Sequence, residues 1–118
     1  MKTLLFMVDK PLHGNIRTQE FIDIALMAAA FEQQVILVFE ADGVYALLKQ
    51  QNPELIGLKN ASPILKALEL YDINDVWVEE ESMLMRGIQS EEFEIGVKVI
   101  PRQNLKQKML MADQVFSF

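Results

Sequence analysis

Apolar residues are concentrated in five short runs along the chain, at residues 3–8, 35–39, 73–78, 97–100 and 114–118. Each run has the length of a β-strand, and the first two are almost continuously apolar. Such runs are typical of parallel strands that are buried on both faces of a sheet. The fourth run alternates apolar and polar positions, so we expect it nearer an edge. The last run must pair with a neighbouring strand, since it would otherwise fray.

The segments between these runs show helical spacing. Apolar side chains recur mainly at three- and four-residue steps over residues 17–34, among them Ile24 and Phe31, and Thr18 is the candidate N-cap. Further helices are predicted at 44–49, from Ser62 and Pro63 to about 71, at 82–86, and around residues 105–112. This alternation predicts a single α/β domain over residues 1–118. Its mostly parallel five-stranded sheet would lie between two helical layers, as in flavodoxin-like proteins.

Composition limits the classes of function. The chain has 118 residues, a net charge of −6 and no cysteine. The absence of cysteine excludes disulfides, thiolate metal sites and a cysteine nucleophile. The negative charge argues against direct nucleic-acid binding, which needs a basic surface. No apolar run approaches the ~18 residues of a membrane span, and Asp9 and Pro11 interrupt the N-terminal run too early for a signal peptide.

Three adjacent acids, Glu79, Glu80 and Glu81, follow the third predicted strand, which we expect at the centre of the sheet. The loop after such a strand is where α/β proteins usually carry their chemistry. In an extended segment Glu79 and Glu81 would share a face, and paired carboxylates serve acid–base or metal chemistry. No histidine or phosphate-binding glycine loop accompanies them. A carboxylate-dependent enzyme is therefore the weakest hypothesis, and a solvated acidic surface is the simpler interpretation.

Two further loops offer candidate ligand contacts. His13 and Gly14 follow the first strand, and Asp42 and Gly43 follow the second. Both pairs are also ordinary turn sequences. If they bind a ligand, the chain would be a stand-alone small-ligand or anion-binding module of flavodoxin-like type. Fold analogy alone supports that alternative, and the sequence predicts neither a cofactor nor a metal.

An apolar turn, Met83, Leu84 and Met85, directly follows the acids. Methionines fill irregular cores but also form adaptable binding surfaces. Burial of all three side chains in so short a turn is difficult to arrange, which favours an interface for at least one of them. Residues 69–94 contain nine of the 17 acidic residues. Such a patch would attract a basic partner.

Several segments together are similar to one known family. They are PLHGN, AFEQQVILVFEADGVYALL, GLKNASP, LELYDINDVWVEEESMLMRGI and the terminal DQVFSF. In this order they cover nearly the whole chain and resemble the DsrE/DsrF-like family, more narrowly its DsrF/TusC branch. The resemblance implies a small cytoplasmic α/β protein of a sulfur relay. It also implies a heterohexamer with two paralogues, a cysteine-bearing DsrE/TusD-type subunit and a DsrH/TusB-type subunit. Such relays serve 2-thiouridine formation at the tRNA wobble position or cytoplasmic sulfur oxidation.

The resemblance also locates the position that carries sulfur in the family. The carrier cysteine lies after the third strand and ahead of an Arg-Gly pair, and counting back from Arg86 and Gly87 places it at about Glu79. A carboxylate cannot hold a persulfide, because the carrier atom must be a nucleophilic sulfur. The resemblance therefore implies a non-catalytic subunit without a cofactor. The interface candidates are Glu80, Glu81, Met83, Leu84 and Met85.

Overall fold

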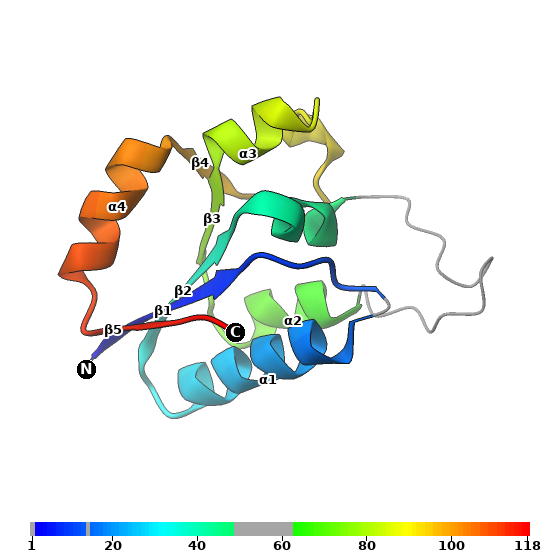
Figure 1. The fold of residues 1–118 in the computed structure, drawn as a ribbon. Helices are drawn as coiled ribbons and strands as arrows, with labels where there is room; N and C mark the ends of the chain where they lie inside the picture. The colour runs from blue at the N-terminus through cyan, green and yellow to red at the C-terminus, as the bar shows by residue number, and fades with distance from the viewer. Residues whose placement is uncertain (1, 14, 49–62) are drawn as a thin grey trace.

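The computed structural model describes residues 2–13, 15–48 and 63–118. In these ranges five strands form one sheet: β1 Thr3–Val8, β2 Gln34–Phe39, β3 Asp75–Glu79, β4 Lys98–Ile100 and β5 Gln114–Phe116. Their spatial order is β4-β3-β2-β1-β5, and every neighbouring pair is parallel (Figure 1). The predicted parallel α/β sheet is confirmed.

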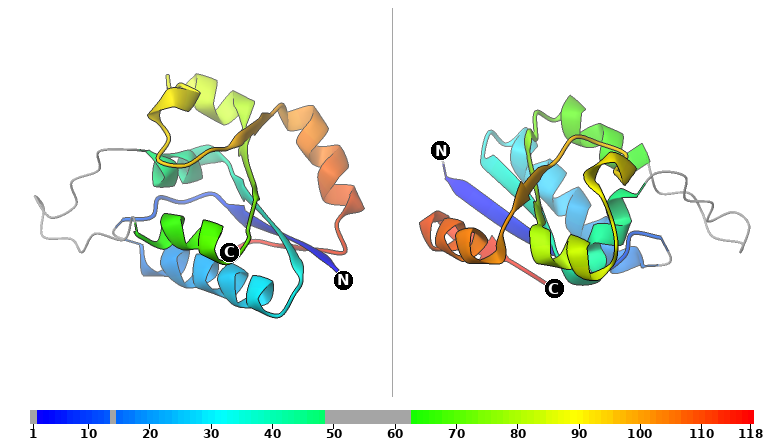
Figure 2. Two further views of the ribbon diagram at one scale, coloured as in Figure 1. Left: turned by 180° about the vertical axis from the view of Figure 1, so that it is seen from behind. Right: turned by 90° about the horizontal axis from the view of Figure 1, so that it is seen from above.

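Helices cover both faces of the sheet (Figures 1 and 2). α1 Ile16–Ala30 and α2 Pro63–Leu70 lie on one face, and α4 Arg102–Met111 lies on the other. The 3₁₀ segment η1 Ala41–Leu47 and the short helix α3 Glu80–Met85 follow β2 and β3 at the carboxyl edge of the sheet. A last 3₁₀ turn, η3, spans Ser90–Glu92.

Side chains from the three inner strands alternate between two hydrophobic cores, as the pleat of a strand requires. Phe6, Leu37 and Val78 are among those that face α1 and α2. Leu5, Met7, Ile36, Val38 and Trp77 face α4 and its buried Leu105. The continuously apolar runs are therefore explained by burial on both faces.

The order of the strands in the sheet confirms two predictions and contradicts a third. β4 is an edge strand, and β5 is held by β1, with Phe116 stacked on Phe6 at 4.9 Å between ring centroids. The expectation that β3 is central was wrong. β2 occupies the centre, because the terminal strand β5 adds beyond β1 and shifts the middle of the sheet by one strand.

The first helix also differs from its prediction. Its N-cap is Asn15, whose side chain accepts a hydrogen bond from the Thr18 backbone N–H at 3.2 Å, so Thr18 is inside the helix. The helix ends at Ala30 because the chain turns at Glu32, which has a φ of 64°. Ile24 and Phe31 are exposed although they belong to the apolar stripe of the predicted helix, which we would expect to be covered.

The shorter elements begin earlier than their apolar residues indicate. The predicted helix at 44–49 is the 3₁₀ segment at Ala41–Leu47, and the turn predicted at 82–86 is α3, which starts at Glu80. The last helix starts at Arg102. Polar residues form the first turn of α3 and α4, and η1 begins with the turn sequence Ala41, Asp42 and Gly43, so the periodicity of apolar residues does not mark these starts. The predicted cap Ser62 lies outside the described residues.

Candidate functional site

Glu79 is the last residue of β3 and the N-cap residue of α3. Two positions after Trp77 in the same strand, it is directed to the face of the sheet that α4 covers. Its side chain is almost completely enclosed, with a relative exposure of 4%. A carboxylate in such surroundings needs charged or hydrogen-bonding partners to remain ionised.

Those partners come from α3 and α4. Ser82 donates its hydroxyl hydrogen to Glu79 Oε1 at 2.5 Å. Arg102 donates from Nε to Oε2 at 3.1 Å and from Nη2 to Oε1 at 2.9 Å. This two-point pairing of a guanidinium with a carboxylate combines charge attraction with fixed geometry. Both oxygens of Glu79 are thereby engaged within the protein.

The neighbouring acids divide between this network and the surface. Glu81 accepts a hydrogen bond from the backbone N–H of Arg102 at 2.8 Å, whereas Glu80 is exposed. Glu79 and Glu81 therefore converge on Arg102. They do so across the beginning of α3 and not along an extended segment, since the helix starts at Glu80.

A second group of contacts connects α3 to η1. The Ser82 hydroxyl accepts a hydrogen bond from the Ala41 backbone N–H at 2.8 Å. Arg86 pairs with Asp42, with 3.1 Å between Nη2 and Oδ1, and also donates to the Ser82 carbonyl at 3.2 Å. Its guanidinium lies 5.9 Å from the centre of the Tyr45 ring, within the range of a cation–π contact.

The electrostatics of the two nearby carboxylates are opposite. The hydrogen bond from Arg102 lowers the pKa of Glu79 below its ordinary value; burial opposes this shift, and the Ser82 hydroxyl reinforces it. Burial raises the pKa of the neighbouring Glu40, and the negative charges of Glu79 and Asp9 raise it further, against the effect of Arg102. Glu79 also raises the pKa of Arg102. Glu79 therefore ionises more readily than an ordinary glutamate, and Glu40 ionises less readily.

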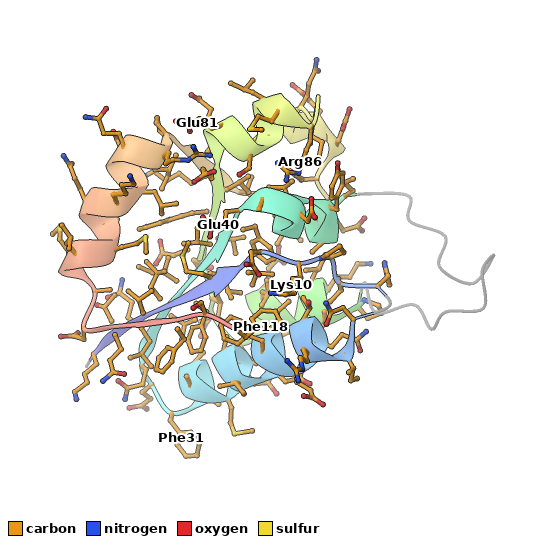
Figure 3. The ribbon with its side chains drawn as sticks, viewed as in Figure 1. Lys10, Phe31, Glu40, Glu81, Arg86 and Phe118 are labelled. Carbon is orange, nitrogen blue, oxygen red and sulfur yellow. The ribbon has the colours of Figure 1, made fainter. Side chains whose placement is uncertain are left out.

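An open groove of about 360 Å³ lies at the carboxyl edge of the sheet, beside Glu79 and Glu40. Figure 3 labels Glu40, Glu81 and Arg86 at this edge. The lining of the groove consists of Glu40, Ala41, Glu79, Ser82, Met85, Arg86 and Arg102. A carboxylate with a lowered pKa and two occupied oxygens is a poor general base. The contacts of Glu79 and Glu81 with Arg102 are suited to hold α3 and α4 in position beside each other. They also fix the protein surface that these two helices form.

Not all of the other predicted site residues line this groove. His13 and Gly43 do not belong to its described lining, and Gly14 lies outside the described residues. A Cβ atom at Gly43 would lie 2.0 Å from the carbonyl oxygen of Val8, so close backbone packing requires the glycine. In the apolar turn, Met83 is buried, whereas Leu84 and Met85 are 70% and 78% exposed.

Sequence reasoning missed the participation of Arg102 and Glu40. Glu40 follows β2 directly and Arg102 follows β4 after Pro101, so both lie where the carboxyl ends of the strands flanking β3 meet. Charged residues at the first or second position after predicted parallel strands are the signal that could have found them. That signal requires knowledge of which strands are neighbours.

A family model described as the DsrE/DsrF-like family matches residues 2–118. The chain belongs to this family. It is similar over its full length to a protein named TusC homolog from Vibrio parahaemolyticus, with 33% identity and complete coverage of both chains. It is 32% identical to the intracellular sulfur oxidation protein DsrF of Allochromatium vinosum, over all of this chain and 97% of the relative. The crystal structure of the ychN protein from E. coli shares the fold, with a TM-score of 0.84 over both complete chains at 22% identity.

The described residues of this DsrE/DsrF-like chain show neither a membrane-spanning helix nor a group of metal ligands. None of its described helices is long and apolar enough to cross a membrane. The same residues contain no cluster of three histidine, cysteine or acidic side chains arranged to hold a metal ion.

Proposed function

We propose that this protein is a non-catalytic subunit of a cytoplasmic, hetero-oligomeric sulfur-relay complex that serves tRNA wobble 2-thiouridine synthesis or sulfur oxidation. One observation carries the proposal. Glu79, paired with Arg102, stands where the family resemblance places the sulfur-carrying cysteine, in a chain without any cysteine. The names of the relatives, TusC homolog and sulfur oxidation protein DsrF, support a place in such a relay.

The chemistry of the site supports an accessory role. A persulfide carrier needs a thiolate that can accept and release sulfur. Glu79 has no sulfur, and both of its oxygens are engaged by Arg102 and Ser82. The protein would therefore contribute binding surface and leave the sulfur on a partner, the cysteine-bearing DsrE/TusD-type subunit. A DsrH/TusB-type subunit would complete the complex.

The α3 surface, defined here as Glu80, Glu81, Leu84 and Met85, is the proposed contact with a partner. Among the described residues, Leu84 and Met85 are the most exposed apolar side chains at this edge, and Glu80 lies beside them. Apolar side chains at the centre of a charged rim are typical of protein interfaces. The acids would favour a partner with basic residues at its own rim.

Co-expression with the two partner subunits of the same organism tests this proposal. The wild-type protein should co-purify with them as one complex by size-exclusion chromatography. The double variant Leu84→Lys with Met85→Lys should weaken assembly at least about tenfold, because interface centres commonly contribute more than 1 kcal/mol per side chain. Leu110→Lys on α4 is the matched control, since Leu110 is equally apolar and exposed. If the protein remains a stable monomer and binds neither subunit, the proposal is wrong.

The two pathways are distinguished in the source organism. Deletion of the gene should remove wobble 2-thiouridine from digested tRNA, measured by mass spectrometry, if the relay serves tRNA. If the relay serves sulfur oxidation, the deletion should leave the nucleoside intact and block oxidation of stored sulfur.

A further inference from the structure

Helix α1 carries apolar side chains on the side that faces away from the protein. Ile16, Ile24 and Met27, together with the C-cap residue Phe31, have relative exposures between 55% and 73%. The buried residues of the helix lie on its opposite side: Thr18, Phe21, Ile22, Ala25 and Leu26. Figure 3 shows Phe31 directed away from the body of the protein.

These exposed residues form one continuous stripe. Positions 16, 20, 24, 27 and 31 follow each other by three or four residues, so they share one face of the helix. We call Ile16, Glu20, Ile24, Met27 and Phe31 the outer face of α1. At 1.5 Å per residue it is about 22 Å long. A helix that is apolar on both sides normally has a partner on each of them.

The charges on α1 indicate the character of the missing partner. Glu20 lies within the outer face and Asp23 lies beside it, whereas Arg17 is the only basic residue of the helix. Acids in and beside an apolar stripe favour a partner with basic groups at the matching positions. The net charge of −6 of the whole chain likewise favours a partner that carries basic groups.

A second copy of the chain does not meet this requirement. Asp23 lies beside the midpoint of the outer face, which runs from residue 16 to residue 31 and has Glu20 within it. Two copies packed antiparallel through this face would bring Asp23 close to its own counterpart, and two copies packed parallel with their stripes aligned would bring Glu20 against its own counterpart. Like charges in juxtaposition across an interface are unfavourable.

We infer that the outer face of α1 binds an amphipathic helix of a different protein, with an apolar stripe and with lysine or arginine side chains that meet Glu20 and Asp23. This site is separate from the α3 surface, because α1 covers one face of the sheet while α3 lies beyond its carboxyl edge (Figure 1). The protein would thus bind two partners at once. The inference rests on the proposed function, since the partner would be a second subunit of the same complex.

Binding measurements with the purified partner subunits test the inference. Met27→Lys should weaken the affinity for one of the two subunits at least about tenfold, because it removes a central apolar contact and repels a basic helix. Glu20→Lys should weaken the same interaction, and more strongly at low salt than at high salt. Leu110→Lys on α4 is again the matched control, and circular dichroism should show that all variants are folded.

The outcomes separate this inference from the proposed function. If the wild-type complex forms and neither α1 variant changes the affinity for either subunit, the inference is wrong and the proposed function stands. If the isolated chain forms a dimer that Met27→Lys dissociates, a second copy occupies the face and the inference is also wrong. If the wild-type chain binds neither subunit, the proposed function fails and the inference fails with it.

Discussion

At the scale of single residues, Glu79 shows how a carboxylate is kept charged inside a protein. Burial alone would favour the protonated form, but a two-point contact with Arg102 and a short bond from Ser82 reverse that preference. Arg102 keeps about half of its side-chain surface exposed, so only one member of the pair loses most of its hydration. The arrangement avoids the larger desolvation cost of a fully buried ion pair.

Replacement of Glu79 by glutamine should lower the free energy of unfolding by about 1–2 kcal/mol at pH 7, because hydrogen bonds to a charged group are lost. The folded-state pKa of Glu79 lies below its ordinary value of 4.5. The ionised carboxylate therefore contributes stability above pH 4.5, and this contribution disappears as the pH falls through the lowered pKa. Urea unfolding at several pH values measures the difference between wild type and variant, which should shrink below pH 4.5.

Glu91→Gln is the matched control for this experiment, since Glu91 is exposed on η3. An equal loss of stability in both variants would contradict the role assigned to the Arg102 contact.

In a reconstituted relay, sulfur transfer with Glu79→Gln should remain largely intact. Near-total loss of transfer would revive a catalytic role for the carboxylate.

At the scale of elements, the short segments α3 and η1 depend on each other. α3 has six residues, which is too few for an isolated helix to be stable in water. Ser82 and Arg86 connect it to Ala41 and Asp42 of η1, and η1 in turn packs against the end of β1. The position of the α3 surface is therefore set by contacts outside α3 itself.

Gly43→Ala should destabilise the protein by roughly 1–3 kcal/mol, the usual cost of forcing an extra methyl group into a packed interior. The added Cβ atom would lie 2.0 Å from the Val8 carbonyl oxygen and 2.7 Å from its carbon, so backbone must move. Thermal and urea unfolding measure the effect. Gly96→Ala is the control, because a Cβ atom there meets no described atom within 4 Å. A variant Gly43→Ala as stable as wild type would show that η1 can shift without cost.

At the scale of the whole molecule, charge is distributed unevenly around the sheet. The exposed acids Glu80, Glu91 and Glu92 follow β3 at its carboxyl edge, whereas α4 carries Arg102, Lys106 and Lys108. Such asymmetry influences how fast and in which orientation partners meet, more than how tightly they bind.

The association rate with the partner that binds the α3 surface should fall about tenfold or more between roughly 20 mM and 500 mM salt, as screening shortens the range of the acidic field. The dissociation rate should change much less. Stopped-flow or surface-based kinetics separate the two rates. The triple variant with glutamine at positions 80, 91 and 92 should associate more slowly at low salt and show a weaker salt dependence. If the association rate of the wild type does not depend on salt, electrostatic steering by the acids at positions 80, 91 and 92 is excluded.

The sequence by itself determined the elements and their class. Apolar runs such as 35–39 predicted strands buried on both faces, and the terminal run was expected to be held by a neighbour, as β5 is. These features are local, because the side-chain period of a strand or helix appears within a few residues. The absence of cysteine likewise needed no structure.

Only the tertiary structure decided which distant residues meet and which apolar residues remain uncovered. Glu79 and Arg102 are 23 positions apart, and they pair because β4 lies beside β3. β2 became the central strand because β5 returned to β1. Ile24 and Phe31 fit a helical apolar pattern yet face outward. Periodicity records that a side chain is apolar and on a given face, but it does not specify whether that face meets the protein's own core or another protein.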